Sequence, residues 1–163
     1  MLITCLRHAT AEPHAGPMAD AERALVKKGK DQMVRVAEFC RKHALLPAKL
    51  YSSPLRRAQQ TAKLLQTHLP DCPAVEIVEW LSLGADPQQI IAELKVLQDA
   101  GVNDVWLVGH EPTMSGLIAR LIAAADDSIL VKKASLTRME VDFANLQSAQ
   151  LLWSIPCALM SSK

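Results

Sequence analysis

The chain has 163 residues, of which 50% are hydrophobic and 21% are charged, and its formal net charge is +1. These values predict one folded domain with a substantial core, and they exclude a disordered chain. The balanced charge gives no reason to expect nucleic acid or an acidic membrane as a partner, so local charges must hold any anionic ligand.

The first half of the chain predicts two strands, each followed by a helix. The short apolar run at 2–6 is typical of a strand that is buried on both faces. After a polar loop, a helix is expected to bury an apolar face formed by Met33, Val36, Ala37, Cys40 and Ala44. A second strand is predicted at 48–53, and Pro54 begins the next helix. The apolar stripe of that helix consists of Leu55, Ala58, Ala62, Leu65 and Leu69.

The second half predicts two more strand–helix units and then a hairpin. The two further strands are expected at 74–81 and 104–109. The helices after them are opened by Asp86-Pro87 and by Pro112, and Gly101 ends the first of these helices. Hydrophobic and polar residues then alternate in two stretches, 135–143 and 149–156. This alternation predicts an antiparallel hairpin at one edge of the sheet.

Repeated strand–helix units indicate a sheet that is largely parallel and covered by helices on both faces. We therefore expect an α/β fold, with residues 1–163 forming a single three-layer α/β/α domain. The antiparallel hairpin strands are expected at its C-terminal edge. In such sheets, ligands bind at the carboxyl ends of the strands, so the residues directly after each strand are the candidates for function.

Arginine and histidine residues follow three of the predicted strands. Arg7 and His8 follow the first strand, Arg56 and Arg57 come shortly after the second, and His110 follows the fourth. Guanidinium groups bind phosphoryl oxygens well, and a neutral histidine can attack phosphorus if a backbone acceptor fixes its other nitrogen. A second, protonated histidine can hold a phosphoryl oxygen. Because phosphoryl transfer needs mainly positioning and charge neutralisation, the pattern predicts a site for this chemistry.

The sequence contains no motif for a metal or a cofactor, and we predict that the protein uses none. The four cysteines, at 5, 40, 72 and 157, form no C-x-x-C pair and have no zinc-ligand spacing. They are interpreted as reduced thiols, with Cys5 and Cys40 in the core, which favours a cytoplasmic location. No targeting segment is recognised, and the longest apolar run is interrupted by Arg120 and is too short to span a membrane.

Three segments together carry a specific resemblance to a family. They are "LRHAT" near the N-terminus, "SSPLRRAQQTA" in the middle and "VGHEPTMSGL" in the last third. In this order the chain resembles the histidine phosphatase superfamily, also called the phosphoglycerate mutase-like family. The resemblance implies a phosphatase in which His8 becomes phosphorylated while Arg7, Arg57 and His110 bind the phosphoryl group. In the motif S-P-x-x-R-A-x-Q-T the functional arginine precedes the alanine, which selects Arg57 rather than Arg56.

In its short length and in the segment "DAERALVKKGKDQ" at 20–32, the chain resembles the small branch of the superfamily that includes the SixA phosphohistidine phosphatases. This likeness implies that the substrate is phosphohistidine in a signalling protein. Two alternatives stay open: a phosphatase of small phosphate esters, and a phosphate-binding module without turnover. The small closed domain suggests a monomer.

The resemblance also directs attention to the acidic residues. Many members of the superfamily place a proton-donating carboxylate after the third strand, where this chain reads "EWLSLGADP". Glu79 and Asp86 are nearby but belong to no convincing motif, which favours a substrate whose leaving group needs little acid assistance. Glu111 has two equal interpretations: it could orient a histidine, or it could favour the positive start of the next helix.

Overall fold

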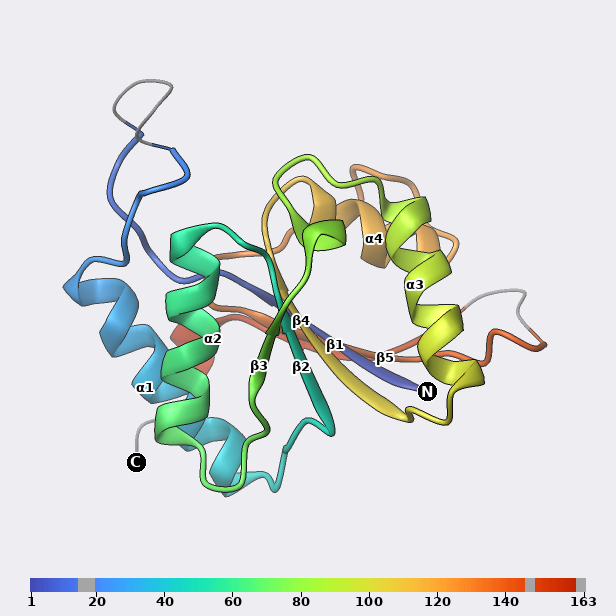
Figure 1. The fold of residues 1–163 in the computed structure, drawn as a ribbon, viewed down its shortest axis with the longest axis horizontal. Helices are drawn as coiled ribbons and strands as arrows, with labels where there is room; N and C mark the ends of the chain where they lie inside the picture. Colours follow the sequence, from blue (N-terminus) through green and yellow to red (C-terminus); the bar gives the residue numbers. More distant parts are fainter. Residues whose placement is uncertain (15–19, 146–148, 161–163) are drawn as a thin grey trace.

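The computed structural model describes residues 1–14, 20–145 and 149–160, and its centre is a six-stranded sheet (Figure 1). The strands in chain order are β1 (Leu2–Arg7), β2 (Lys49–Ser52), β3 (Val75–Ile77), β4 (Asp104–Gly109), β5 (Leu136–Glu140) and β6 (Gln150–Ile155). They lie in the order β3-β2-β4-β1-β5-β6. The first four are parallel, whereas β5 is antiparallel to β1 and β6 is antiparallel to β5. The predicted α/β class and the hairpin at the C-terminal edge are confirmed.

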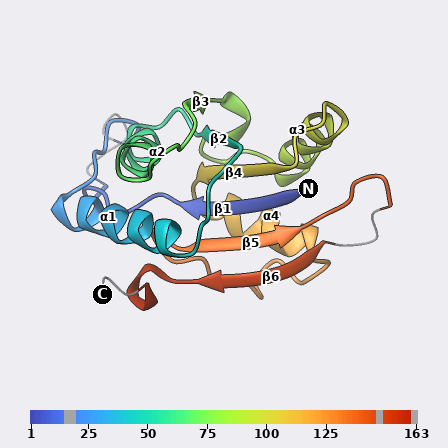
Figure 2. The same ribbon diagram turned by 90° about the horizontal axis from the view of Figure 1, so that it is seen from below.

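Helices cover both faces of the sheet, as Figures 1 and 2 show. The helices are α1 (Lys27–Lys42), α2 (Arg56–His68), α3 (Pro87–Asp99) and α4 (Thr113–Leu121). Apolar side chains of α1 and α2 form one buried cluster, and those of α3 and α4 form the other. Strand β4 serves both, since Trp106 and Val108 belong to the first cluster and Val105 and Leu107 to the second. This alternation explains why the central strands are apolar along their whole length.

The structure corrects two of the predicted elements. The expected strand at 74–81 is shorter, because β3 ends at Ile77 and a single 3₁₀ turn follows at Glu79–Leu81. The turn buries Leu81 and sets Trp80 against the Tyr51 ring, which extended backbone at the sheet edge would not do. The helix α1 ends at Lys42, and Ala44 is exposed with φ at 52°, so it is not part of the buried face.

Backbone hydrogen bonds of the parallel strands continue one residue beyond the strand ends. The His8 N–H donates to the Gly109 carbonyl at 3.0 Å, and the Ser53 N–H donates to the Val108 carbonyl at 3.0 Å. The loops that follow β1, β2 and β4 therefore start side by side at one edge of the sheet, where the sequence placed the candidate residues.

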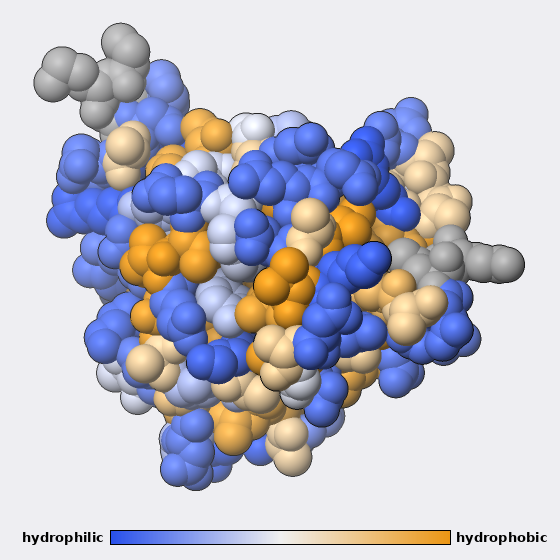
Figure 3. Space-filling model, turned by 45° about the vertical axis from the view of Figure 1, so that its right-hand side comes forward, coloured by the Kyte–Doolittle hydropathy of each residue, from blue (hydrophilic) through white to orange (hydrophobic). Residues whose placement is uncertain are grey.

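The four cysteines are free thiols. Cys5 and Cys40 are wholly buried in the core as expected, and burial raises the pKa of each to about 12. Both are therefore protonated and unreactive at neutral pH. In the described ranges, no helix is long and apolar enough to cross a membrane. Figure 3 shows a face on which hydrophilic side chains separate small apolar areas, an ordinary pattern for a protein surface.

Candidate active site

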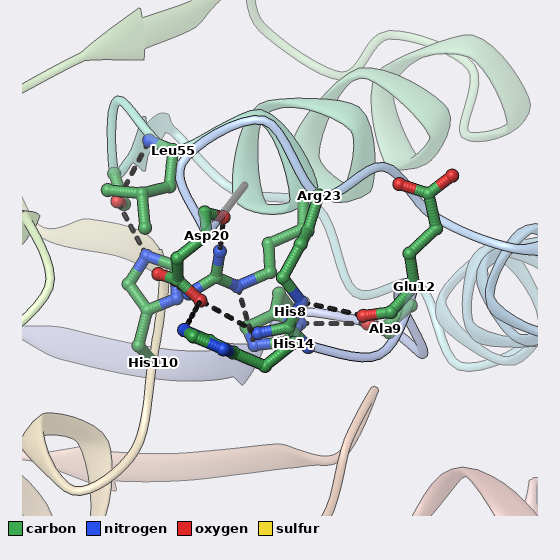
Figure 4. A network of polar contacts seen from close by, with 10 residues as sticks. His8, Ala9, Glu12, His14, Asp20, Arg23, Leu55 and His110 are labelled. Atoms are coloured by element: carbon green, nitrogen blue, oxygen red, sulfur yellow. Dashed lines mark hydrogen bonds and ion pairs between the residues drawn. The ribbon is translucent and has the colours of Figure 1, made fainter. Parts of the chain in front are cut away.

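His8 directly follows β1 and is buried. Its Nδ1 lies 2.8 Å from the carbonyl oxygen of Ala9 (Figure 4). Because a carbonyl oxygen can only accept a hydrogen bond, Nδ1 must carry the proton, and the lone pair of the neutral ring is on Nε2. The backbone thus fixes which nitrogen can attack an electrophile, in the manner expected of a nucleophilic histidine.

Arg57 lies in the first turn of α2, and only 3% of its surface is exposed. Its Nε donates to Nε2 of His8 at 3.3 Å. The neighbouring Arg56 is exposed instead and donates to the carbonyl oxygen of Glu22 at 3.4 Å. The structure therefore brings Arg57, and not Arg56, to His8, in the register that the second motif implied.

Asp20 supplies a carboxylate that the sequence analysis did not single out. Arg57 donates to the Asp20 carbonyl oxygen at 2.7 Å and to the carboxylate at 3.3 Å, and Arg23 binds the other carboxylate oxygen at 2.9 Å. The hydrogen bond from Arg23, followed by the charge of Arg57, lowers the pKa of Asp20, so this group is ionised at neutral pH. A phosphoryl group that binds Arg57 must share its donors with Asp20. The D-x-x-R spacing of segment 20–32 was the signal that could have identified this pair.

His110 directly follows β4 and lies beside His8, with 5.2 Å between the ring centroids. Its Nε2 is 2.6 Å from the Ser53 hydroxyl, which also accepts a hydrogen bond from the Leu55 N–H at 3.3 Å (Figure 4). Its Nδ1 is buried and has no hydrogen-bond partner among the described residues. Ser53 thus holds one nitrogen of the ring, and the other is left to meet a ligand.

Arg7 is the last residue of β1 and is half-buried. One of its terminal nitrogens donates to the Val131 carbonyl at 2.8 Å. Its Nε is buried and, within the described part of the chain, has no hydrogen-bond partner. Buried donors normally have partners, so this nitrogen is a second group that an incoming anion can satisfy.

Burial is the largest influence on the charge state of both histidines. It lowers the pKa of His8 to about 4, and the positive charges of Arg57 and Arg7 act in the same direction. Burial and then the neighbouring His8 lower the pKa of His110 to about 3. Both rings are therefore neutral at neutral pH in the free site, and a protonated His110 on a bound phosphoryl group stays a prediction. A neutral ring can still donate one N–H to a phosphoryl oxygen.

Residues that the sequence analysis did not select hold the segment after His8 in place. The Thr61 hydroxyl accepts from the Ala9 N–H at 3.0 Å and donates to the Arg57 carbonyl at 2.7 Å, which ties the loop to α2. Gly29 packs against the same segment, since a Cβ there would lie 2.1 Å from the Thr10 carbonyl oxygen. The threonine of the second motif and the glycine of segment 20–32 are thus parts of the support of His8.

The other candidate carboxylates form their hydrogen bonds outside this group of side chains, although Glu111 is near enough to Arg7 for its charge to oppose the lowering of the Arg7 pKa by burial. Glu79 accepts a hydrogen bond from the Ser82 hydroxyl, and Asp86 caps α3 by accepting from the Gln88 N–H. Glu111 accepts from the Ser115 N–H at 2.9 Å, which favours its interpretation as a stabiliser of the start of α4. No cluster of three or more His, Cys, Asp or Glu side chains suited to a metal occurs in residues 1–14, 20–145 and 149–160, and metal independence stays a prediction.

Comparison with known proteins assigns the family. The model of the histidine phosphatase superfamily (branch 1) matches residues 3–83, a range that includes Arg7, His8 and Arg57. The chain belongs to the histidine phosphatase superfamily. It is accordingly a hydrolase of the phosphatase type, as the motifs predicted. No curated protein matches the sequence.

Solved structures share the histidine phosphatase fold along almost the whole chain. The protein histidine phosphatase SixA in complex with tungstate has a TM-score of 0.87 and 22% identity, covering 97% of this chain and 98% of SixA. The alpha-ribazole phosphatase of Shigella flexneri has a TM-score of 0.73 and 18% identity, with 93% and 94% coverage. A phosphoserine phosphatase of Entamoeba histolytica has a TM-score of 0.71 and 16% identity, with 94% and 95% coverage. At these identities the likeness establishes the fold.

The neighbouring arginines of this histidine phosphatase provide a matched pair of variants. We expect Arg57→Ala to lower kcat/KM by about 10²–10³, the usual effect of removing one preorganised donor that stabilises charge in the transition state. Arg56→Ala should have little effect because its side chain is exposed. Steady-state rates with an aryl phosphate measure both, and equal losses in the two variants would contradict the placement of Arg57.

The charge state of His8 can be measured directly. Because its pKa is lowered from 6.5 to about 4, we expect the neutral ring with hydrogen on Nδ1 to persist well below pH 6. Ring-nitrogen chemical shifts of ¹⁵N-labelled protein report both the charge and the tautomer, and His8→Gln assigns the signal. A His8 signal that titrates near 6.5, or one with hydrogen on Nε2, would be inconsistent with the geometry.

Proposed function

We propose that this histidine phosphatase hydrolyses phosphohistidine in a protein, through an intermediate in which His8 carries the phosphoryl group. The observation that carries the proposal is a neutral, oriented His8 that, among the residues that the structure describes, has no suitable proton donor beside it. The carboxylate that does reach the group, Asp20, is kept ionised by Arg23 and Arg57. Glu79 and Asp86 are engaged elsewhere.

In the first step, Nε2 of His8 attacks phosphorus and the P–N bond of the substrate breaks. The Arg57 Nε–H must leave Nε2 to free its lone pair, and it then donates to a phosphoryl oxygen. The unpartnered nitrogens of Arg7 and His110 are suited to the remaining phosphoryl oxygens. These groups offset the negative charge of the transferred phosphoryl group without a metal.

The protons balance without a general acid when the leaving group is imidazole. A phosphohistidine ring can take a proton from solvent at the nitrogen remote from phosphorus, so it leaves as neutral imidazole. His8 begins neutral with hydrogen on Nδ1 and becomes a phosphorylated cation. The Ala9 carbonyl accepts the Nδ1–H bond throughout and stabilises that cation. In the second step, water attacks phosphorus, and neutral His8 and inorganic phosphate are formed.

A second candidate function is hydrolysis of small phosphate esters. It is supported by the likeness in fold to the alpha-ribazole and phosphoserine phosphatases, and by the position of Asp20, which binds Arg57 and is near enough to His110 for its charge to act on that ring. An ester oxygen must be protonated at the atom that leaves, so this function needs Asp20 to act as an acid. The lowered pKa of Asp20 argues against that role.

The proposal is tested by measuring phosphate release from a phosphotransfer domain that carries phosphohistidine and comparing it with phosphate release from a panel of alkyl phosphates. We expect rapid release from the phosphoprotein and slow release from the esters. Release from the esters alone would assign the protein to the second function. The His8→Ala variant serves as the control for uncatalysed hydrolysis of the labile P–N bond.

A further inference from the structure

A cavity lined in part by Arg7 adjoins the group of side chains around His8. Its volume is about 330 Å³. The cationic side chains that line it are Arg7, Lys28, Lys132 and Lys133, and no acidic side chain lines it. We call the three lysines of this cavity the basic subsite. Four positive charges around one small cavity repel one another, and an anion placed among them would relieve this repulsion.

Among the described residues, the positive charge of the basic subsite has no carboxylate partner. Within the part of the chain that the structure describes, no salt bridge involves Lys28, Lys132 or Lys133. Burial lowers the pKa of Lys133, and the charges of Arg7, Arg23 and Lys28 lower it further. A protein surface usually interleaves charges of both signs, so an uncompensated group next to a reactive site is informative.

The cavity is fixed relative to His8 by backbone contacts. The Ala134 N–H donates to the Arg7 carbonyl at 3.0 Å, and Arg7 in turn donates to the Val131 carbonyl. The segment that carries Lys132 and Lys133 is therefore attached at both ends to the residue that precedes the nucleophile. Lys133 is also near enough for its charge to contribute to the low pKa of His8.

We propose that the basic subsite binds a second anionic group of the substrate, carried on the leaving group rather than on the transferred phosphoryl. The ligand chemistry is a carboxylate or a further phosphate. This inference rests on the proposed function. With a phosphohistidine protein as substrate, the second anionic group is an acidic side chain close to the phosphohistidine on the protein surface. The three lysines then select substrates by charge, while Arg7 connects the two anion sites.

The test compares substrates that differ only in the second anion. One pair consists of phosphohistidine peptides with glutamate or glutamine beside the phosphohistidine. The other pair consists of carboxyphenyl phosphate and phenyl phosphate. The variant combines Lys28→Gln, Lys132→Gln and Lys133→Gln. A control with the same change in net charge combines Lys30→Gln, Lys63→Gln and Lys95→Gln, three exposed lysines outside the cavity. Thermal unfolding confirms that both remain folded.

In the wild type, we expect kcat/KM to favour the glutamate peptide over the glutamine peptide. The variant should reduce that preference roughly tenfold, the combined effect of a few partly exposed ion pairs. The control variant should retain the preference, and added salt should weaken it in the wild type because exposed charges are screened. A preference that is equal in the wild type and in the subsite variant would overturn the proposal.

The two pairs separate this inference from the proposed function. If the aryl pair responds to the variant while neither peptide is hydrolysed, the anionic subsite is supported and the phosphohistidine substrate is wrong. If both peptides are hydrolysed equally well by all three proteins and the aryl pair does not respond, the phosphohistidine substrate is supported and the subsite is refuted.

Discussion

Replacing His8 with alanine is expected to abolish turnover, with a loss of about 10⁴-fold or more, as is usual when a covalent nucleophile is removed. The reason is specific to the geometry. Nε2 of His8 holds the lone pair, Nδ1 is committed to the Ala9 carbonyl, and burial keeps the ring neutral. His68→Ala is the control, because that histidine is exposed at the end of α2.

The same experiment can locate the phosphoryl group. Enzyme mixed with an aryl phosphate and quenched in alkali, where a P–N bond survives, should carry phosphate on the peptide that contains His8. The signal should be missing in His8→Ala and present in His68→Ala. Phosphate mapped to Ser53, whose hydroxyl is bonded to His110, would show that His8 is not the nucleophile. Normal turnover by His8→Ala would do the same.

The second large effect concerns the leaving group. We expect kcat/KM for a phosphohistidine substrate to exceed that for an alkyl phosphate by about 10²–10⁴, the usual contribution of general acid catalysis. An aryl phosphate should fall between them, because a phenolate is a better leaving group than an alkoxide. The order follows from the ionised state of Asp20 and from the hydrogen bonds that Glu79 and Asp86 make to other residues.

Three variants show whether a carboxylate assists the ester reaction. Glu79→Gln and Asp86→Asn should leave the ratio between the three substrates unchanged, and asparagine caps a helix about as well as aspartate, so α3 remains intact. Asp20→Asn is the sensitive variant. If it selectively removes activity toward the alkyl phosphate, then Asp20 is a proton donor, and the lack of a proton donor does not explain the order of the three substrates.

The sequence predicted the fold well because its helices and central strands have clear periodicity. It failed at β3, where "VEIVEWL" reads as one strand, because the burial of Leu81 and the contact of Trp80 with Tyr51 are tertiary effects that no local pattern records. The end of α1 was misplaced for a simpler reason. Ala44 favours helix, but the chain turns there through a positive φ that prepares the entry to β2.

The candidate site was predictable where residues directly follow strands. His8 and His110 were selected in this way and Arg57 by the register of the second motif, and the structure brings the three together. Asp20 and the basic subsite were missed because Asp20, Lys132 and Lys133 come from loops, whose position relative to the sheet depends on contacts far apart in sequence, and because Lys28 meets them only in the tertiary structure. The neutral state of His110 in the free site could not be predicted because charge state depends on burial, which a sequence pattern does not measure.

The hydrogen bond from His8 to Gly109 has a consequence for how the chain tolerates insertions and deletions. Arg7 pairs with Gly109, so the two histidines occupy neighbouring places at the ends of adjacent strands. Side chains alternate between the faces of a sheet, so removing one residue from β1 or β4 would turn one histidine toward the opposite face. Loops at the opposite ends of the strands can change length without this effect, whereas the lengths of β1 and β4 must stay matched to keep both histidines in the site.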